Sequence, residues 1–147
     1  MKKVVLLLAI TSLSLISCTR DNPPNSGPAN SLEGKWKMVS SKDNTSGTIM
    51  TKPATEAADV EVIFTLPVSD IGSFTAKTAN NEIGKSYYYL GTHQAISIPV
   101  INTTKVAETS WGGQFANYIL NSQSYFFEAD GKLDIVTSVK TLAFVKE

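Results

Sequence analysis

Hydrophobic and polar residues alternate in several short stretches of the chain, as they do in a β-strand with one buried face. Within 32–39, Trp36 and Met38 alternate with two lysines, which predicts a first strand. In 60–66 the alternation predicts a strand that Pro67 ends, with a buried face made of Val60, Val62, Phe64 and Leu66. Further strand-like stretches are 73–78, 86–90, 95–99, 125–128, 132–139 and 141–145.

Turn-forming residues separate these stretches. They lie at 70–72, at Asn80–Asn81, around His93 and at Asp130–Gly131, where the Asp-Gly pair is typical of a two-residue hairpin. We interpret Asn80 and Asn81 as turn residues with positive φ angles. Short strands joined by close turns predict a mostly β domain, an antiparallel meander that forms a small barrel or a strongly bent sheet.

The segment 108–121 has the period of a helix instead. Its large apolar residues recur every fourth position, with Leu120 beside them, and Thr109 or Ser110 precedes them as a cap. Gly112 and Gly113 weaken this helix by roughly 1 kcal/mol each but let its first turn approach the sheet closely. We therefore expect one amphipathic helix of about three turns, packed on the sheet through Trp111, Phe115 and Ile119.

The first 17 residues have the pattern of a signal peptide. Lys2 and Lys3 precede the apolar run 4–16, which is too short to span a membrane. The run ends in Leu15-Ile16-Ser17-Cys18, which resembles the lipobox of bacterial lipoproteins. The resemblance implies a covalent diacylglyceryl group on the Cys18 sulfur and cleavage after Ser17. The alternative is an ordinary cleavable signal followed by an unpaired thiol, because Cys18 is the only cysteine in the chain.

The segment 18–31 predicts a flexible tether after the lipidated cysteine. It is rich in Pro, Gly and polar residues and almost devoid of apolar ones, so it has too little apolar area to fold. An export signal for the cell surface would typically be an acidic cluster after the cysteine, and only Asp21 is present there. We expect an outer-membrane lipoprotein on the periplasmic face, with the cell surface as the alternative.

The rest of the chain, 32–147, predicts a single domain. In 18–147, which leaves out Lys2 and Lys3, 11 basic side chains stand against 13 acidic ones, and neither kind is concentrated in a patch. This distribution argues against nucleic acid as a partner. The expected membrane contact is the lipid on Cys18, and no other cofactor is expected.

Candidate catalytic residues are sparse. His93 is the only histidine and lies in a turn-like Gly-Thr-His-Gln stretch, so triads and histidine metal clusters are not expected. No calcium loop or phosphate-binding glycine loop is present. We predict no enzyme and no metal site, although two carboxylates brought together by folding would leave a hydrolase open. The carboxylates are scattered singly, as Glu33, Asp59, Glu61, Glu82, Glu108, Glu128 and Asp134.

Three consecutive tyrosines, Tyr87, Tyr88 and Tyr89, form the most conspicuous cluster. On a strand, the first and third face one way and the second the other, so at least one ring is expected at the surface. Such rings suit contact with a glycan or a protein. The alternative is that all three fill core and surface positions of a β-prone strand.

Several short motifs follow one another in the domain, at 74–76, 80–87, 96–98, 103–108 and 142–144. In this order they resemble the META/HslJ-like domain. The resemblance implies a small β-rich envelope domain linked to stress or drug tolerance, without an established catalytic residue. Ala79 and Glu108 stand where that family often has cysteines, so it implies no redox chemistry here. The first hypothesis is therefore a non-catalytic stress or interaction module that binds another envelope component.

A second resemblance starts from Gly34-Lys35-Trp36, which is similar to the Gly-x-Trp motif that opens lipocalins. It implies a carrier for a small apolar ligand, with an interior cavity lined by Phe64, Phe74 or Phe126. A Trp packed in any β core explains the tripeptide equally well.

Overall fold

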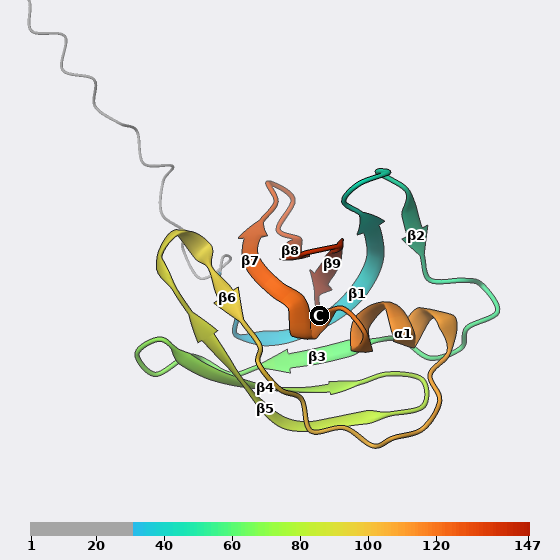
Figure 1. Cartoon of the computed structure of the whole chain (residues 1–147), viewed down its shortest axis with the longest axis horizontal. Coiled ribbons are helices and arrows are strands. Elements are labelled where there is room, and N and C mark those ends of the chain that lie inside the picture. Colours follow the sequence, from blue (N-terminus) through green and yellow to red (C-terminus); the bar gives the residue numbers. More distant parts are fainter. Residues whose placement is uncertain (1–30) are drawn as a thin grey trace, which may run out of the picture.

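Nine strands form one antiparallel sheet in the computed structural model, which describes residues 31–147 (Figure 1). The order across the sheet is β6-β5-β4-β3-β1-β9-β8-β7, and β2 pairs with the C-terminal end of β1. The predicted signal peptide, Ser17, Cys18 and the tether up to residue 30 lie outside the described residues. The strands are β1 Gly34–Asp43, β2 Ile49–Thr51, β3 Glu61–Phe64, β4 Ile71–Lys77, β5 Glu82–Leu90, β6 Ile96–Ser97, β7 Ser122–Phe127, β8 Leu133–Thr137 and β9 Lys140–Lys146.

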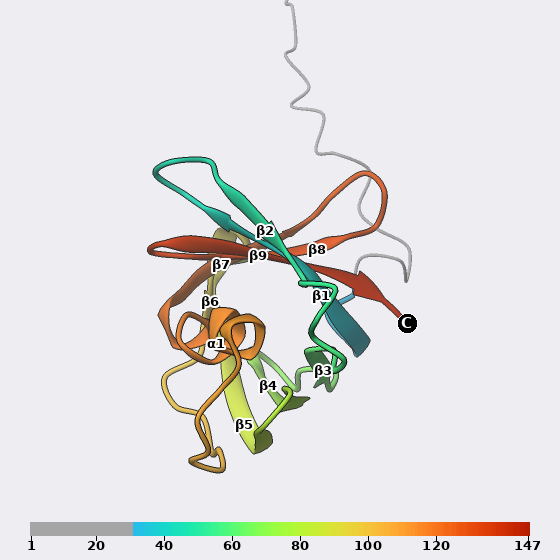
Figure 2. The same ribbon diagram turned by 90° about the vertical axis from the view of Figure 1, so that its right-hand side faces the viewer.

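The sheet curls until its two ends meet. A single antiparallel bridge between Ala95, just before β6, and Ser124 of β7 joins the first and last strands of the order. The result is a nearly closed barrel, which confirms the predicted antiparallel β architecture. Figure 2 looks into one end of this barrel, where α1 lies inside the ring of strands.

Strand alternation places large apolar side chains inside the barrel. Trp36 and Met38 of β1 are buried, while Lys35 and Lys37, which alternate with them, are partly exposed, as the pattern predicted. The indole nitrogen of Trp36 donates a hydrogen bond of 2.7 Å to the carbonyl of Leu32, so this buried polar atom is satisfied. Residues from each major element complete one core cluster, among them Val62, Phe74, Tyr88, Ile96, Trp111, Leu133, Leu142 and Phe144.

Tyr88 of β5 packs inside the barrel against residues of β3 and β4. Its ring meets the edge of Phe64 at 5.5 Å between centroids, and Phe64 lies 5.5 Å from Phe74. The Tyr88 hydroxyl donates to the Thr65 carbonyl at 2.8 Å. Burial raises the pKa of Tyr88 to about 12, because the charged phenolate is disfavoured away from water. Gly72 of β4 leaves room for the ring, since a Cβ there would lie 2.0 Å from it.

The helix α1, Ser110–Ala116, closes one end of the barrel. Thr109 caps it, accepting a 3.0 Å hydrogen bond from the Gly112 amide. The predicted stripe is confirmed, since Trp111, Phe115 and Ile119 are all buried. The helix is shorter than the predicted 108–121, because after Ala116 the chain tightens into 3₁₀ hydrogen bonds and Ile119–Asn121 forms a separate 3₁₀ turn. Leu120 is exposed.

Some predicted strand boundaries are wrong, at places where consecutive residues are exposed and do not alternate between buried and exposed. Leu66 does not join the buried face of β3, because the strand ends at Phe64 and Leu66 lies in the exposed β3–β4 turn. Strand β4 begins at Ile71, inside the predicted turn 70–72. Strand β2 was not predicted, since its three residues are all exposed and carry no alternating pattern.

The pair Gly84 and Gly72 offers a matched test of the packing around Tyr88. Gly72→Ala is expected to destabilise the domain by about 2–3 kcal/mol or more, because the new methyl group overlaps a fully buried ring. Gly84→Ala adds a methyl group whose nearest neighbouring atom is 3.8 Å away, an ordinary van der Waals contact. Its effect on the free energy of unfolding should therefore stay within about 1 kcal/mol. Urea unfolding followed by tryptophan fluorescence measures both, and equal effects would contradict this account of the Tyr88 site.

Candidate functional site

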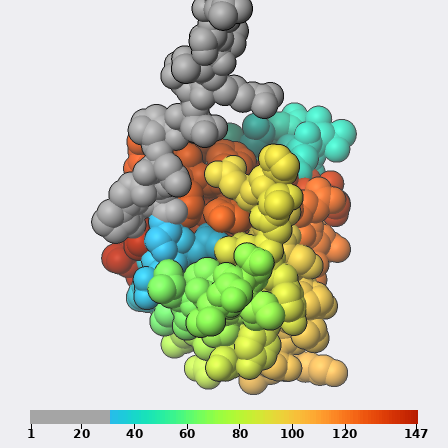
Figure 3. Space-filling view, turned by 90° about the vertical axis from the view of Figure 1, so that its left-hand side faces the viewer, coloured from blue at the N-terminus to red at the C-terminus, as the bar shows by residue number. Residues whose placement is uncertain are grey.

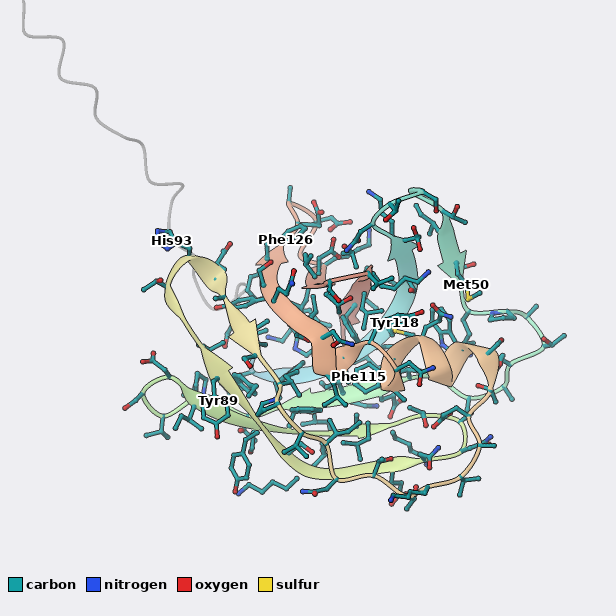
Figure 4. The ribbon with its side chains drawn as sticks, viewed as in Figure 1. Met50, Tyr89, His93, Phe115, Tyr118 and Phe126 are labelled. Carbon is teal, nitrogen blue, oxygen red and sulfur yellow. The ribbon has the colours of Figure 1, made fainter. Side chains whose placement is uncertain are left out.

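His93 lies at the tip of the turn between β5 and β6, exposed to solvent (Figure 4). It has φ 58°, and the next residue, Gln94, has φ 60°, so the turn uses the left-handed region twice. Across the described range, no group of three or more His, Cys, Asp and Glu side chains could hold a metal ion. None of the helices in 31–147 has the length and apolar character needed to cross a membrane.

The three tyrosines divide between the inside and the outside of the barrel. Tyr87 is 46% exposed and Tyr89 is 44% exposed, on the outer face of β5, as the strand alternation predicted. Tyr88 is fully buried, so its inclusion among the surface-contact residues was wrong. The opposite orientation of neighbouring side chains on a strand, with a filled interior on one side, is the physical reason.

The two exposed tyrosines belong to a larger apolar surface. Ile71 of β4 is directly opposite Tyr89 in the sheet, and Ile63 of β3 lies further along the same outer face. We call Ile63, Ile71, Tyr87 and Tyr89 the tyrosine face. The ammonium group of Lys85 lies 5.5 Å from the centre of the Tyr87 ring, which orients a cation over an aromatic surface.

A shallow groove of about 360 Å³ adjoins the tyrosine face near Ile63. The register of β4 and β5 shifts between Phe74 and Ala76, and Gly84 contributes no side chain, so the surface is hollowed there. The groove is lined by Glu61, Ile63, Thr75, Ala76, Lys77, Glu82, Ile83 and Gly84. An apolar floor with charged residues at its end suits contact with a protein surface.

Asn80 and Asn81 hold the β4–β5 turn to the loop before α1, although neither has the predicted positive φ angle. The Asn81 amide donates to the Val106 carbonyl at 2.8 Å, and its oxygen accepts from Thr104 and from the Val106 amide, both at 2.9 Å. Glu108 accepts hydrogen bonds from Thr78 and Asn81. Since these bonds bind one loop to another, the two asparagines have a structural role.

A second groove, of about 440 Å³, lies on the outer face between the β1–β2 and β7–β8 hairpins. Asp134 of β8 is in its lining, and within the described part of the chain its carboxylate has neither a hydrogen bond nor an ion pair. Sequence reasoning treated Asp134 as one scattered carboxylate, because residues distant along the chain build this groove. The lining comprises Ser40, Lys42, Ile49, Glu128, Ala129, Asp130, Lys132, Asp134, Thr141 and Ala143.

Burial raises the pKa of Asp134 to about 6, and the negative charge of Glu128 adds to the effect. Lys132 and Lys42 act in the opposite direction, and Lys132 already forms an ion pair with Asp130. The carboxyl group therefore changes its charge close to neutral pH. A raised pKa in a cleft marks a group that is sensitive to its surroundings.

The interior offers little support for a ligand cavity lined by phenylalanines. Phe64 and Phe74 are buried, but their rings pack against each other. The prediction that Phe126 lines an interior cavity is wrong. It pairs with Asp134 on the outer face of β7, while its neighbours Tyr125 and Phe127 pack against the core.

The pKa of Asp134 generates a test of stability against pH. Its folded value of about 6 lies above the ordinary 3.8, so the proton binds more tightly to the folded state. The resulting stabilisation is complete below about pH 4 and is lost as the pH rises to about 6. Asp134→Asn should therefore raise the Tm by a few degrees at pH 7.5, with the gain shrinking towards pH 4.5. Thermal unfolding measures it, Glu82→Gln is the control, and a gain independent of pH would contradict the assignment.

Comparisons with known proteins address the fold alone. No family model matches the chain, and no curated protein matches it. An NMR structure of a protein from Burkholderia xenovorans is similar, with a TM-score of 0.52 and 16% sequence identity over 78% of this chain and 82% of that chain. At this identity the likeness supports a shared barrel-like β architecture.

Proposed function

We propose that this protein is a bacterial envelope lipoprotein, held to the outer membrane by lipid on Cys18, whose β domain binds another envelope protein through the tyrosine face. The domain acts as a non-catalytic module of the META/HslJ-like kind. The observation that carries the proposal is the exposure of two neighbouring tyrosine rings and Ile71 on a sheet whose opposite face is fully packed.

The sequence supports the anchor. A positively charged start, a short apolar run and Leu15-Ile16-Ser17-Cys18 follow one another as they do in lipoprotein precursors. One lipid chain gives only marginal membrane binding, whereas the diacylglyceryl group supplies two. Lipidation would also account for a single cysteine in a chain with no partner for a disulfide.

The physical chemistry of the tyrosine face supports a protein partner. Tyrosine supplies a large contact area at low cost in side-chain entropy and is enriched at the centres of protein interfaces. Here Tyr89 is paired on both sides, with β4 and with β6, and Tyr87 is paired with β4, so little order has to be gained on binding. Lys85 and the charged ends of the adjoining groove provide a polar rim.

The carrier hypothesis is the second candidate, and we rank it lower. A carrier needs an apolar cavity, whereas Phe64, Phe74 and Tyr88 fill the part of the barrel where such a cavity was expected. The barrel-like architecture is compatible with both hypotheses.

The anchor is tested by replacing the lipidated residue. Cys18→Ser should move the protein from the membrane fraction to the soluble or secreted fraction and abolish labelling with radioactive palmitate, because the hydroxyl group cannot carry the thioether-linked lipid. The folded domain should keep its Tm, since residue 18 precedes the folded domain. Continued palmitate labelling of the Ser variant would refute the anchor.

The interface is tested by crosslinking in intact cells. Tyr87→Ala combined with Tyr89→Ala should lower the yield of crosslinked partner by about tenfold, since two aromatic contacts are lost. The Phe variants of both residues keep the rings and should retain most of the yield. Ile49→Ala with Met50→Ala removes the same number of exposed apolar side chains from β2 and should have no effect. Equal crosslinking by the Tyr and β2 double variants would refute the proposed interface.

A further inference from the structure

The β3–β4 turn exposes apolar side chains at one end of the barrel. Val68 is 81% exposed and Leu66 is 60% exposed, and Ile71 and Tyr89 continue the apolar surface onto the sheet. Leaving such side chains in water forgoes the stabilisation that burial would give. A contiguous group at a projecting turn indicates a surface that is covered in the working protein.

Hydrogen bonds hold this turn in one conformation. Val68 and Ile71 exchange two backbone hydrogen bonds, of 2.9 Å and 3.3 Å. The Thr65 hydroxyl accepts from the Ser73 amide at 3.1 Å and donates to the Ser73 carbonyl at 2.9 Å. The apolar side chains therefore project from a structured tip, which lowers the entropy cost of inserting them elsewhere.

The same end of the barrel receives the chain that leads from Cys18. Gly34 at the start of β1 pairs with Phe64 at the end of β3, so the first described residues lie beside the β3–β4 turn. Figure 3 shows this end, with the blue start of the domain next to the green turn. The helix α1 and the loop around Val106 lie at the β4–β5 end, away from the β3–β4 turn.

Few residues connect the lipidated cysteine to the domain. Twelve residues lie between Cys18 and Ser31, and even a fully extended chain between these two residues spans no more than about 47 Å. A lipid anchored at Cys18 would thus keep this end of the barrel close to the bilayer surface and raise the local concentration of the turn there.

The side chains at the turn suit the boundary between headgroups and acyl chains. Leu66 and Val68 are apolar, and Leu and Val are among the side chains that enter a bilayer most favourably. Glu33 and Asp70 are acidic and exposed, and Lys146 lies next to Gly34 at the same end, so the local charges of both signs do not favour an anionic surface. The chemistry fits a zwitterionic lipid surface.

We propose that the β3–β4 turn inserts Leu66 and Val68 into the membrane that holds Cys18, so that the domain sits on the bilayer with the tyrosine face standing beside it. This inference rests on the lipid anchor of the proposed function. It gives the anchored domain a second membrane contact and a defined orientation.

The experiment uses the full lipidated chain with a polarity-sensitive dye on a single introduced thiol. Val68→Cys places the dye at the tip, and Val106→Cys is the matched control, also exposed but at the other end. Because lipid would block Cys18, the introduced cysteine is the only thiol to label. In phosphatidylcholine vesicles the emission of the dye at 68 should shift to the blue, and its quenching constant with an aqueous quencher should fall roughly threefold or more. The emission and quenching of the dye at 106 should not change.

Three outcomes separate this inference from the anchor itself. If the parent chain reacts with dye at Cys18 and does not float with vesicles, the lipid anchor fails and the inference falls with it. If the chain floats but positions 68 and 106 are quenched equally, the insertion is refuted and the anchor stands. If position 68 is protected in native membranes but not in pure lipid vesicles, a protein covers the turn, which also refutes the insertion.

Discussion

Large aromatic side chains fill the barrel, and this filling constrains the rest of the molecule. Trp36, Phe64, Tyr88, Trp111 and Phe115 are all buried in one cluster. Because each strand gives alternate side chains to that cluster, the side chains between them must face outwards. The outer surface and the turns are thus where binding chemistry has to be sought. Chemistry inside the barrel would require space that these rings already occupy.

The two ends of the barrel differ in how they are closed. At one end α1 inserts Trp111 and Phe115, and the Asn81 and Glu108 hydrogen bonds hold the loops around it. At the other end the chain enters at Ser31 beside an apolar β3–β4 turn. A polar, well-bonded end and an apolar, exposed end make the two ends of the domain chemically different.

Parts of the candidate site could be predicted from the sequence. The alternation in Tyr87, Tyr88 and Tyr89 indicated that neighbouring rings face opposite ways, and the structure decided that Tyr88 is the inner one. The groove around Asp134 could not be predicted, because its lining comes from β1, β2, β8, β9 and the β7–β8 turn. The raised pKa of Asp134 depends on burial by those distant neighbours, and no local pattern records them.

By itself the sequence determined the mostly β class, the main strands and the buried stripe of the helix, because each depends on residues close together in the chain. The tertiary structure decided the closure between β6 and β7, the exposure of Leu66 and the position of Phe126 on the outer face. These depend on how distant segments pair. Alternation in the sequence indicates that the two faces of a strand differ. Only packing against the other strands decides which face is inside and where the strand ends.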